Sequence, residues 1–285
     1  MILRTPQHCL YGATASSILK LMLVDAHFHA DDLYGHDPEF PRRYRDAGVV
    51  GLASVHDGSG LAATRRIMAG AGPWLLSFGL HPQLPVMDEA ARLETLASSG
   101  QLAAIGECGF DFFGDVPQRV RNDENLKAQR MVFEFQLELA ERQGLPLVLH
   151  LRRADDLLFG YSRRLSRLPA VILHSWGGPA NEAKDFYARC PNARFSFGGT
   201  ILNGNKKARA SAAALPAGAI LSETDAPFQP PREAPLPGAR LIREYSTIED
   251  LPMTLKELAR LRIVPVEQLQ EQINTNFMEV FNYAL

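Results

Sequence analysis

Short runs of apolar, often β-branched residues recur along the chain, and segments with helical spacing separate them. Such runs are typical of the buried parallel strands of repeated βα units. The clearest helical segment is 125–144, where Val132, Phe135 and Leu139 share one face. Gly144 is well placed to end this helix. The predicted strands lie at 21–29, 48–56, 73–82, 102–111, 145–152, 170–178, 193–200 and 219–227.

Eight parallel strands alternating with helices are closed most economically as a (β/α)8 TIM barrel. An open, doubly wound sheet has the same periodicity, so the choice rests on the number of strands. A length of 285 residues suits one α/β barrel domain. We therefore predict a barrel over 21–285 after an N-terminal extension, 1–20. The extension lacks the apolar core of a secretory signal, so we expect an edge element or the product of an upstream start codon.

The net charge and the cysteine content limit which binding partners and which cellular compartment the sequence is compatible with. Thirty Lys and Arg against 32 Asp and Glu leave a formal charge of −2, so any polyanion must be held locally. Cys9, Cys108 and Cys190 are too few and scattered for a disulfide framework or a thiolate zinc site. No apolar run approaches the length of a membrane span. We expect a monomeric protein of the reducing cytoplasm with no membrane partner.

Polar residues gather where the predicted strands end. Catalytic groups of α/β barrels lie at this face, because the βα loops there form the shared concave surface. Six of the eight histidines fall at strand ends once His56 is included, whereas solvated histidines have no reason to gather there. The other strand-end residues are Asp25, His27, His29, His81, Glu107, Asp111, His150, His174, Glu223 and Asp225.

The His-x-His spacing of the first strand suits a pair of metal ligands. Side chains alternate along a strand, so His27 and His29 point the same way and Phe28 points among the packing helices. Two imidazoles roughly 7 Å apart converge on one cation if the strand is ending and curving. Asp225, from the neighbouring strand of a closed barrel, supplies a carboxylate.

Glu107, across the barrel mouth, has two oxygens and can bridge to a second cation completed by His150 and His174. Four imidazoles and two carboxylates predict a dinuclear site for borderline divalent metals. Taken singly, a His-x-His pair is more often incidental, and a strand-end histidine is more often only hydrogen-bonded. Burying the whole set costs several kcal/mol unless something compensates it, and a metal pair does so.

Other strand-end residues have less defined roles. His81 either contacts substrate at the rim or belongs to a turn before Pro82. We expect no function for His8, His36 and His56. The proline-rich segment 226–240 is either a rigid surface connection or a wall of the pocket.

Several separated motifs, and their order along the chain, resemble those of the TatD-type metal-dependent DNases, within the amidohydrolase-like superfamily of TIM barrels. The resemblance runs from Val24 to the C-terminus. It implies a nuclease or phosphodiesterase stimulated by magnesium or manganese, often a 3′ to 5′ exonuclease. The motifs are "DAHFH", "GLHP", "GECGFD", "LPLVLHLR", "ILHSWGG", "LSETDAP" and "INTNFMEVF".

The resemblance also implies two divalent ions (Mg, Mn or Zn) and divides six ligands between them. One ion takes His27, His29, Glu107 and Asp225, and the other takes Glu107, His150 and His174. The ions would activate water against a phosphodiester of DNA or a related substrate, with Glu107 bridging them and Asp225 accepting the proton.

Other polar residues are assigned supporting roles around this mechanism. Arg152 is a candidate phosphate contact, as are Lys206 and Lys207 in the loop after the seventh strand, unless these lysines are simply solvated. We assign Asp25 the role of orienting an imidazole.

Two other functions remain open on the sequence. A barrel hydrolase acting on a small amide, lactone or phosphoester can use the same metals. Many such relatives bridge their metals with a carbamylated lysine, and residues 103–111 contain no lysine, so Glu107 favours the nuclease-like branch. A non-catalytic metal-binding protein is the second alternative, and the complete ligand set weighs against it.

Overall fold

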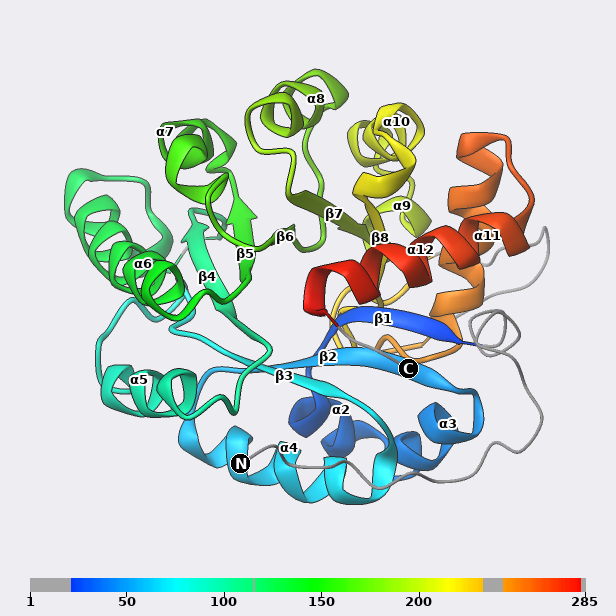
Figure 1. The fold of residues 1–285 in the computed structure, drawn as a ribbon, viewed down its shortest axis with the longest axis horizontal. Helices are drawn as coiled ribbons and strands as arrows, with labels where there is room; N and C mark the ends of the chain where they lie inside the picture. Colours follow the sequence, from blue (N-terminus) through cyan, green and yellow to red (C-terminus); the bar gives the residue numbers. More distant parts are fainter. Residues whose placement is uncertain (1–21, 115, 233–242, 283–285) are drawn as a thin grey trace.

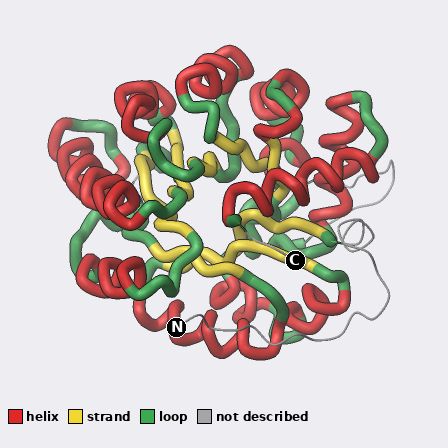
Figure 2. The backbone as a smooth tube through the Cα atoms, viewed as in Figure 1, coloured by secondary structure: helices red, strands yellow, loops and turns green. Residues whose placement is uncertain are grey.

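The computed structural model describes residues 22–114, 116–232 and 243–282. The strands form one parallel sheet in chain order, ringed by helices (Figures 1 and 2). The predicted extension, 1–20, lies outside the described residues. The strands are β1 (Leu23–Phe28), β2 (Val49–Val55), β3 (Leu75–Phe78), β4 (Ala104–Asp111), β5 (Leu147–Arg152), β6 (Val171–Leu173), β7 (Ala193–Phe197) and β8 (Ile220–Ser222).

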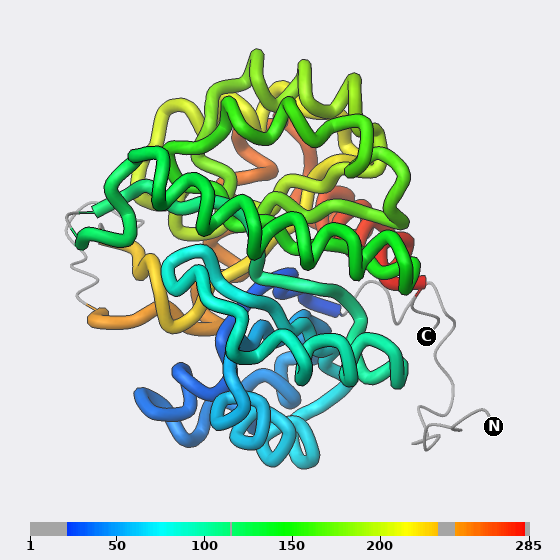
Figure 3. Tube along the Cα trace, turned by 90° about the vertical axis from the view of Figure 1, so that its left-hand side faces the viewer, coloured from blue at the N-terminus to red at the C-terminus, as the bar shows by residue number. Residues whose placement is uncertain are grey.

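The sheet curves until its last strand lies beside its first. The Asp225 backbone N–H donates to the His27 carbonyl (3.0 Å), and the His29 N–H donates to the Ala226 carbonyl (2.8 Å). The side view shows the early part of the chain, blue and cyan, on one side and the green helices on the other (Figure 3). The sheet is thus a nearly closed (β/α)8 barrel, as predicted, and not an open doubly wound sheet.

The predicted helix 125–144 is α6 (Asp123–Gln143). The Asn122 side chain accepts a hydrogen bond from the Asn125 N–H at its start, and Gly144 ends it with φ 63°. The remaining α-helices are α2 (Ala30–His36), α3 (Phe40–Asp46), α4 (Gly58–Ala71), α5 (Ala90–Ser98), α7 (Asp155–Leu165), α8 (Ala180–Arg189), α9 (Gly199–Leu202), α10 (Lys206–Ala214), α11 (Asp250–Arg262) and α12 (Val266–Phe281).

Two further expectations concern cysteines and membrane spans. Cys108 and Cys190, the cysteines within the described ranges, are buried and unpaired. In the same ranges no helix is both long enough and apolar enough to cross a membrane.

Aromatic side chains fill the space between β1 and the helices outside it. Phe28 is fully buried, with its ring centroid 5.2 Å from that of Tyr44 and 5.1 Å from that of Trp74. Phe28 therefore points away from the mouth and into the helical layer, which confirms the alternation predicted for the first strand.

Irregularities in β1 and β4 lie next to the predicted ligands. The register of β1 against β2 shifts between Asp25 and Phe28, and that of β4 against β5 shifts between Ile105 and Cys108. Such bulges re-aim side chains at barrel rims. Gly106, between the paired residues of β4, has φ 141°, and a Cβ there would lie 2.5 Å from the Val148 carbonyl oxygen. A glycine is therefore required immediately before Glu107.

The last helix, α12, packs across the opposite end of the barrel from the predicted ligands. The Asn276 amide donates to the carbonyls of Ala217 and Ile220, both at 2.8 Å, and the Asn274 amide donates to the Met22 carbonyl at 3.1 Å. The asparagines of "INTNFMEVF" thus join α12 to the segments that begin β8 and β1.

Replacing Phe28 by alanine should lower the free energy of unfolding by about 3–5 kcal/mol, because it leaves a cavity among packed aromatic rings. Urea denaturation followed by circular dichroism measures this loss. Met131→Ala, at a side chain that is 55% exposed, is the control and should change the value by less than about 1 kcal/mol. Equal losses in both variants would contradict the packing described for Phe28.

Candidate metal centre

Six side chains from five strand ends converge at the mouth of the barrel. Each is buried, with at most 8% of its surface exposed. All six were predicted as ligands, and the structure brings them together, although their role as ligands stays a prediction. They are His27, His29, Glu107, His150, His174 and Asp225.

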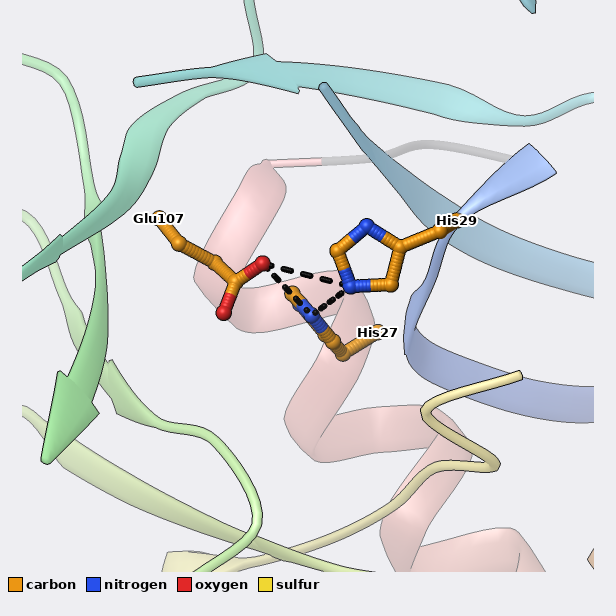
Figure 4. Close-up of side chains that lie close together, drawn as sticks. All are labelled: His27, His29 and Glu107. Carbon is orange, nitrogen blue, oxygen red and sulfur yellow. Dashed lines mark hydrogen bonds and ion pairs between the residues drawn. The ribbon is translucent and has the colours of Figure 1, made fainter. Parts of the chain in front are cut away.

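The first group surrounds one oxygen of Glu107. The Nε2 atoms of His27 and His29 lie 3.2 Å apart and 3.3 and 3.2 Å from Glu107 Oε1 (Figure 4). Asp225 Oδ1 lies 3.6 and 3.5 Å from the same two nitrogens. Two imidazole nitrogens and two carboxylate oxygens therefore face one small volume, as the ligands of a divalent cation do.

The second group surrounds the other oxygen of Glu107. Glu107 Oε2 lies 2.9 Å from His174 Nε2 and 3.1 Å from His150 Nδ1, and these two nitrogens are 3.0 Å apart. The ring of His174 also lies 4.2 Å, centroid to centroid, from that of His27. The two Glu107 oxygens thus serve different imidazole pairs, and His174 lies beside both groups.

The imidazoles keep the central carboxylates ionised. Burial alone would raise the pKa of Glu107, but the charges of His27, His174 and His29 hold it well below its usual value. Burial opposes ionisation of Asp225 too, and a hydrogen bond with His29 and the imidazole charges lower its pKa. The centre therefore offers two carboxylates as anions.

Two buried serines, missed by the sequence analysis, fix the orientation of His27. Ser54 Oγ lies 3.0 Å from His27 Nδ1 and 2.7 Å from Ser77 Oγ. Because Ser54 occupies Nδ1, the Nε2 atom is left to face the centre, which is how partners of a metal-bound histidine orient it. Hydroxyl residues inside the otherwise apolar strands 48–56 and 73–82 were the available signal.

Asp111 has the corresponding role for His150. Its Oδ2 lies 3.1 Å from His150 Nε2 and accepts a hydrogen bond from the Gln83 amide at 2.7 Å. Burial would raise the pKa of Asp111, but the hydrogen bond and charge of His150 bring it well below its usual value. Asp111 was predicted to lie at a strand end, but no role was predicted for it.

The role predicted for Asp25 was wrong. Its carboxylate accepts hydrogen bonds from the Thr224 N–H (2.8 Å), the Thr224 hydroxyl (2.7 Å) and the Tyr44 hydroxyl (3.0 Å). Within the described residues it bonds no imidazole. The register shift after Asp25 interrupts the alternation that would have aligned it with His27. Asp25 instead joins β1 to the segment after β8, and burial raises its pKa to about 7.

Residues after β6 and β8 form a hydrogen-bonded group around Asp225 and the nearby Glu223. The Gln229 amide donates to Asp225 Oδ2 and Ser175 Oγ, both at 2.6 Å. The Ser175 N–H donates to Glu223 Oε1 at 2.6 Å, and the Ser196 hydroxyl donates to Glu223 Oε2. The start of segment 226–240 therefore forms part of the wall, and 233–240 lies outside the described residues.

The predicted substrate contacts lie at different depths. His81 Nε2 is 3.6 Å from Glu107 Oε2, and its side chain is only 16% exposed, so it lies deeper than a rim position. Burial, the largest effect, lowers its pKa to about 4. Arg152 is exposed at the end of β5. Lys206 and Lys207 are exposed in the first turn of α10 and not in a loop.

Two of the histidines expected to have no function contact none of the six predicted ligands. His56 is exposed beside Asp57, with His56 Nε2 3.8 Å from the carboxylate. His36 stacks on Tyr245 at 5.0 Å between ring centroids. His8 lies outside the described residues.

The chain is a (β/α)8 barrel with imidazoles and ionised carboxylates at its mouth. These features are typical of the barrel hydrolases that depend on metal ions. The model of the family described as TatD related DNase matches residues 24–282. The chain belongs to this family, and it is a metal-dependent hydrolase.

Relatives in bacteria share most of the chain. The 3′-5′ ssDNA/RNA exonuclease TatD of Cronobacter sakazakii is 32% identical over 260 residues, which cover 87% of this chain and 93% of the relative. YjjV of Escherichia coli K12, named an uncharacterized metal-dependent hydrolase, is 28% identical over 268 residues, 91% and 97% of the two chains.

Solved structures agree on the fold. The crystal structure of YjjV superimposes with a TM-score of 0.76 at 26% identity and covers 94% of this chain and 100% of that one. A TatD family hydrolase from Entamoeba histolytica gives a TM-score of 0.75 at 12% identity, covering 91% and 97% of the two chains, and supports the fold alone.

Protons should compete with metal for this centre. Burial would lower the pKa of His29, but the charge of Glu107 and the hydrogen bond and charge of Asp225 raise it to about 9, whereas burial lowers the pKa of His27 to about 4. A metal ion must displace the His29 proton at neutral pH. Affinity for Mn²⁺ should therefore rise by up to about tenfold per pH unit towards pH 9 and then level off.

Titration calorimetry on the metal-free protein, in buffers of different protonation enthalpy, counts the protons released on binding. The metal-free fold should also lose stability as the pH rises through about 9, since the His29 proton stabilises the folded state fully below its unfolded pKa, about 6.5. Constant Mn²⁺ affinity from pH 6 to 9, without proton release, would contradict this account of His29.

Proposed function

We propose that this protein hydrolyses phosphodiester bonds in DNA, as a 3′ to 5′ exonuclease that uses two divalent metal ions. The observation that carries the proposal is the division of the Glu107 oxygens between two imidazole pairs. A carboxylate so placed is the natural bridge between two cations. Relatives named as exonucleases of single-stranded DNA and RNA, such as that of Cronobacter sakazakii, support the substrate class.

The ligand sets follow the two sides of Glu107. Bound there, two divalent ions would lower the pKa of a water molecule towards neutrality and offset negative charge on a phosphoryl group. The donor set suits Mg²⁺, Mn²⁺ or Zn²⁺, since it mixes imidazole nitrogen with carboxylate oxygen. One ion would take His27, His29, Glu107 and Asp225, and the other Glu107, His150 and His174.

Asp225 is the group that we propose as proton acceptor. Its low pKa keeps it ionised, and Gln229 fixes one of its oxygens while the other faces His27 and His29. A carboxylate held in this way can take a proton from water without first rotating. Gln229 thereby sets the orientation in which Asp225 acts.

Substrate would be held by groups beyond the ligands. Arg152 is the last residue of β5, two residues after His150, and its guanidinium suits a phosphate oxygen. His81, beside Glu107, is the second contact that we propose. The buried, unpaired Cys108 and Cys190 suit a reducing cytoplasm, where we propose that the protein acts as a monomer.

The activity is tested on protein stripped of metal and reloaded with Mg²⁺, Mn²⁺ or Zn²⁺. The expected result is stepwise shortening of single-stranded DNA from its 3′ end, together with hydrolysis of a chromogenic phosphodiester. Strands labelled at the 3′ or the 5′ end distinguish the two polarities. If protein carrying two equivalents of metal hydrolyses neither substrate, the small-molecule hydrolase becomes the better explanation.

Glu107→Gln should lower turnover more than about 100-fold and reduce bound metal below two equivalents, because even outer partners of metal ligands cost about 10–100-fold. Metal content is measured by mass spectrometry after gel filtration. Glu94→Gln, at an exposed carboxylate paired with Arg142, is the matched control and should retain both properties. Wild-type activity in Glu107→Gln would rule out the bridging role.

A further inference from the structure

An exposed phenyl ring lies beside the metal centre, in contact with two arginines. Of these three residues, the proposed mechanism uses only Arg152. The guanidinium carbons of Arg152 and Arg153 lie 4.0 and 4.8 Å from the ring centroid of Phe113, which is 41% exposed. Cations at this distance from a ring face are held by cation–π attraction. We name these three residues the Phe113 clamp.

Both guanidinium groups of the clamp keep their charge available. Within the described residues neither Arg152 nor Arg153 forms an ion pair, whereas nearby Arg121 donates to Asp156 at 2.6 and 3.0 Å. Arg153 borders a surface hollow with Asp155, Asp156 and Glu182, and none of these is within ion-pair distance of it. The clamp therefore presents two cations on a protein whose net charge is −2.

Short connections fix the clamp relative to the metal centre. The Phe113 N–H donates to Asp111 Oδ1 at 2.8 Å, and the other oxygen of Asp111 contacts His150. The Phe112 N–H donates to the Arg152 carbonyl at 2.9 Å, which joins the ends of β4 and β5. One carboxylate thus positions both a predicted ligand and the ring that holds the arginines.

Apolar side chains extend the same rim. Gln83, after β3, accepts a hydrogen bond from Arg119, after β4, at 2.7 Å, so these two loops are joined. Exposed apolar surface of this kind suits unstacked bases, which a duplex hides. The exposed large apolar residues of these two loops are Leu84, Val86, Phe113, Val116 and Val120.

We propose that the Phe113 clamp binds a backbone phosphate of a single-stranded polynucleotide, next to the phosphodiester that the centre hydrolyses. This inference rests on the proposed function. A planar guanidinium already stacked on a ring loses less side-chain entropy when it grips a phosphate, and two of them can hold its non-bridging oxygens. A small phosphodiester has no second phosphate and cannot use the clamp.

The test compares a single-stranded oligonucleotide with a chromogenic phosphodiester, using metal-loaded protein over a series of salt concentrations. Arg153→Gln and Phe113→Leu should raise KM for the oligonucleotide about tenfold, with a much smaller change in kcat. The loss of kcat/KM for the oligonucleotide should exceed the loss of kcat/KM for the small substrate by the same factor of about ten. Arg153→Gln should also reduce the salt slope of oligonucleotide binding by about 0.7, the value of one lost phosphate contact.

Two further variants separate the clamp from general effects of charge and folding. Phe113→Tyr keeps a ring under the guanidinium groups and should restore most of the affinity lost in Phe113→Leu. Arg167→Gln removes an exposed positive charge after α7, at the opposite end of the barrel, and should leave the salt slope unchanged. An equal effect of Arg153→Gln and Arg167→Gln would overturn the clamp.

Fluorescence anisotropy of a labelled oligonucleotide separates failure of the clamp from failure of the proposed function. If the protein hydrolyses no phosphodiester but Arg153→Gln still weakens binding about tenfold, the clamp stands and the proposed nuclease activity falls. If Arg153→Gln and Phe113→Leu bind the strand as the wild type does, the clamp is wrong whatever the activity. Equal binding of duplex and single strand would also overturn it.

Discussion

The rest of the site depends on one buried carboxylate, Glu107, and its attraction to the imidazoles around it. A carboxylate only 4% exposed is costly to ionise unless charges and hydrogen bonds compensate it. Here each oxygen faces its own imidazole pair, so the compensation comes from both sides of the mouth. The other devices serve this arrangement: Gly106 brings β4 close to β5, and Ser54 and Asp111 orient His27 and His150.

Much of the fold could be predicted because each barrel strand is buried on both faces and reads as a short apolar run. The number of runs indicated a barrel, and Gly144 ended α6 where expected. The six predicted ligands also converge, since strand ends of a parallel barrel share one face. Their placement followed from the alternation of side chains along each strand and from the topology of the barrel.

The misplaced role of Asp25 and the missed partners have a common cause. Which side chain meets which across strands depends on register, and the irregularities in β1 and β4 leave no clear mark in one sequence. Asp25 was assigned to an imidazole, but the register of β1 shifts directly after it, and its carboxylate bonds Thr224 and Tyr44 instead. The contacts of Ser54 with His27 and of Gln229 with Asp225 join distant segments or cross a turn, and no local pattern predicts them.

The seam between β1 and β8 links closure of the barrel to the residues predicted to bind metal. Two backbone-to-backbone hydrogen bonds join β1 to the segment after β8, and they involve His27, His29, Asp225 and Ala226. Three of these four residues also carry predicted ligand side chains. A cation held by those side chains would bind only the closed seam, and by mass action it would oppose local opening there. Metal binding and barrel closure would then be thermodynamically linked, and a higher metal occupancy would make opening of the β1–β8 seam rarer.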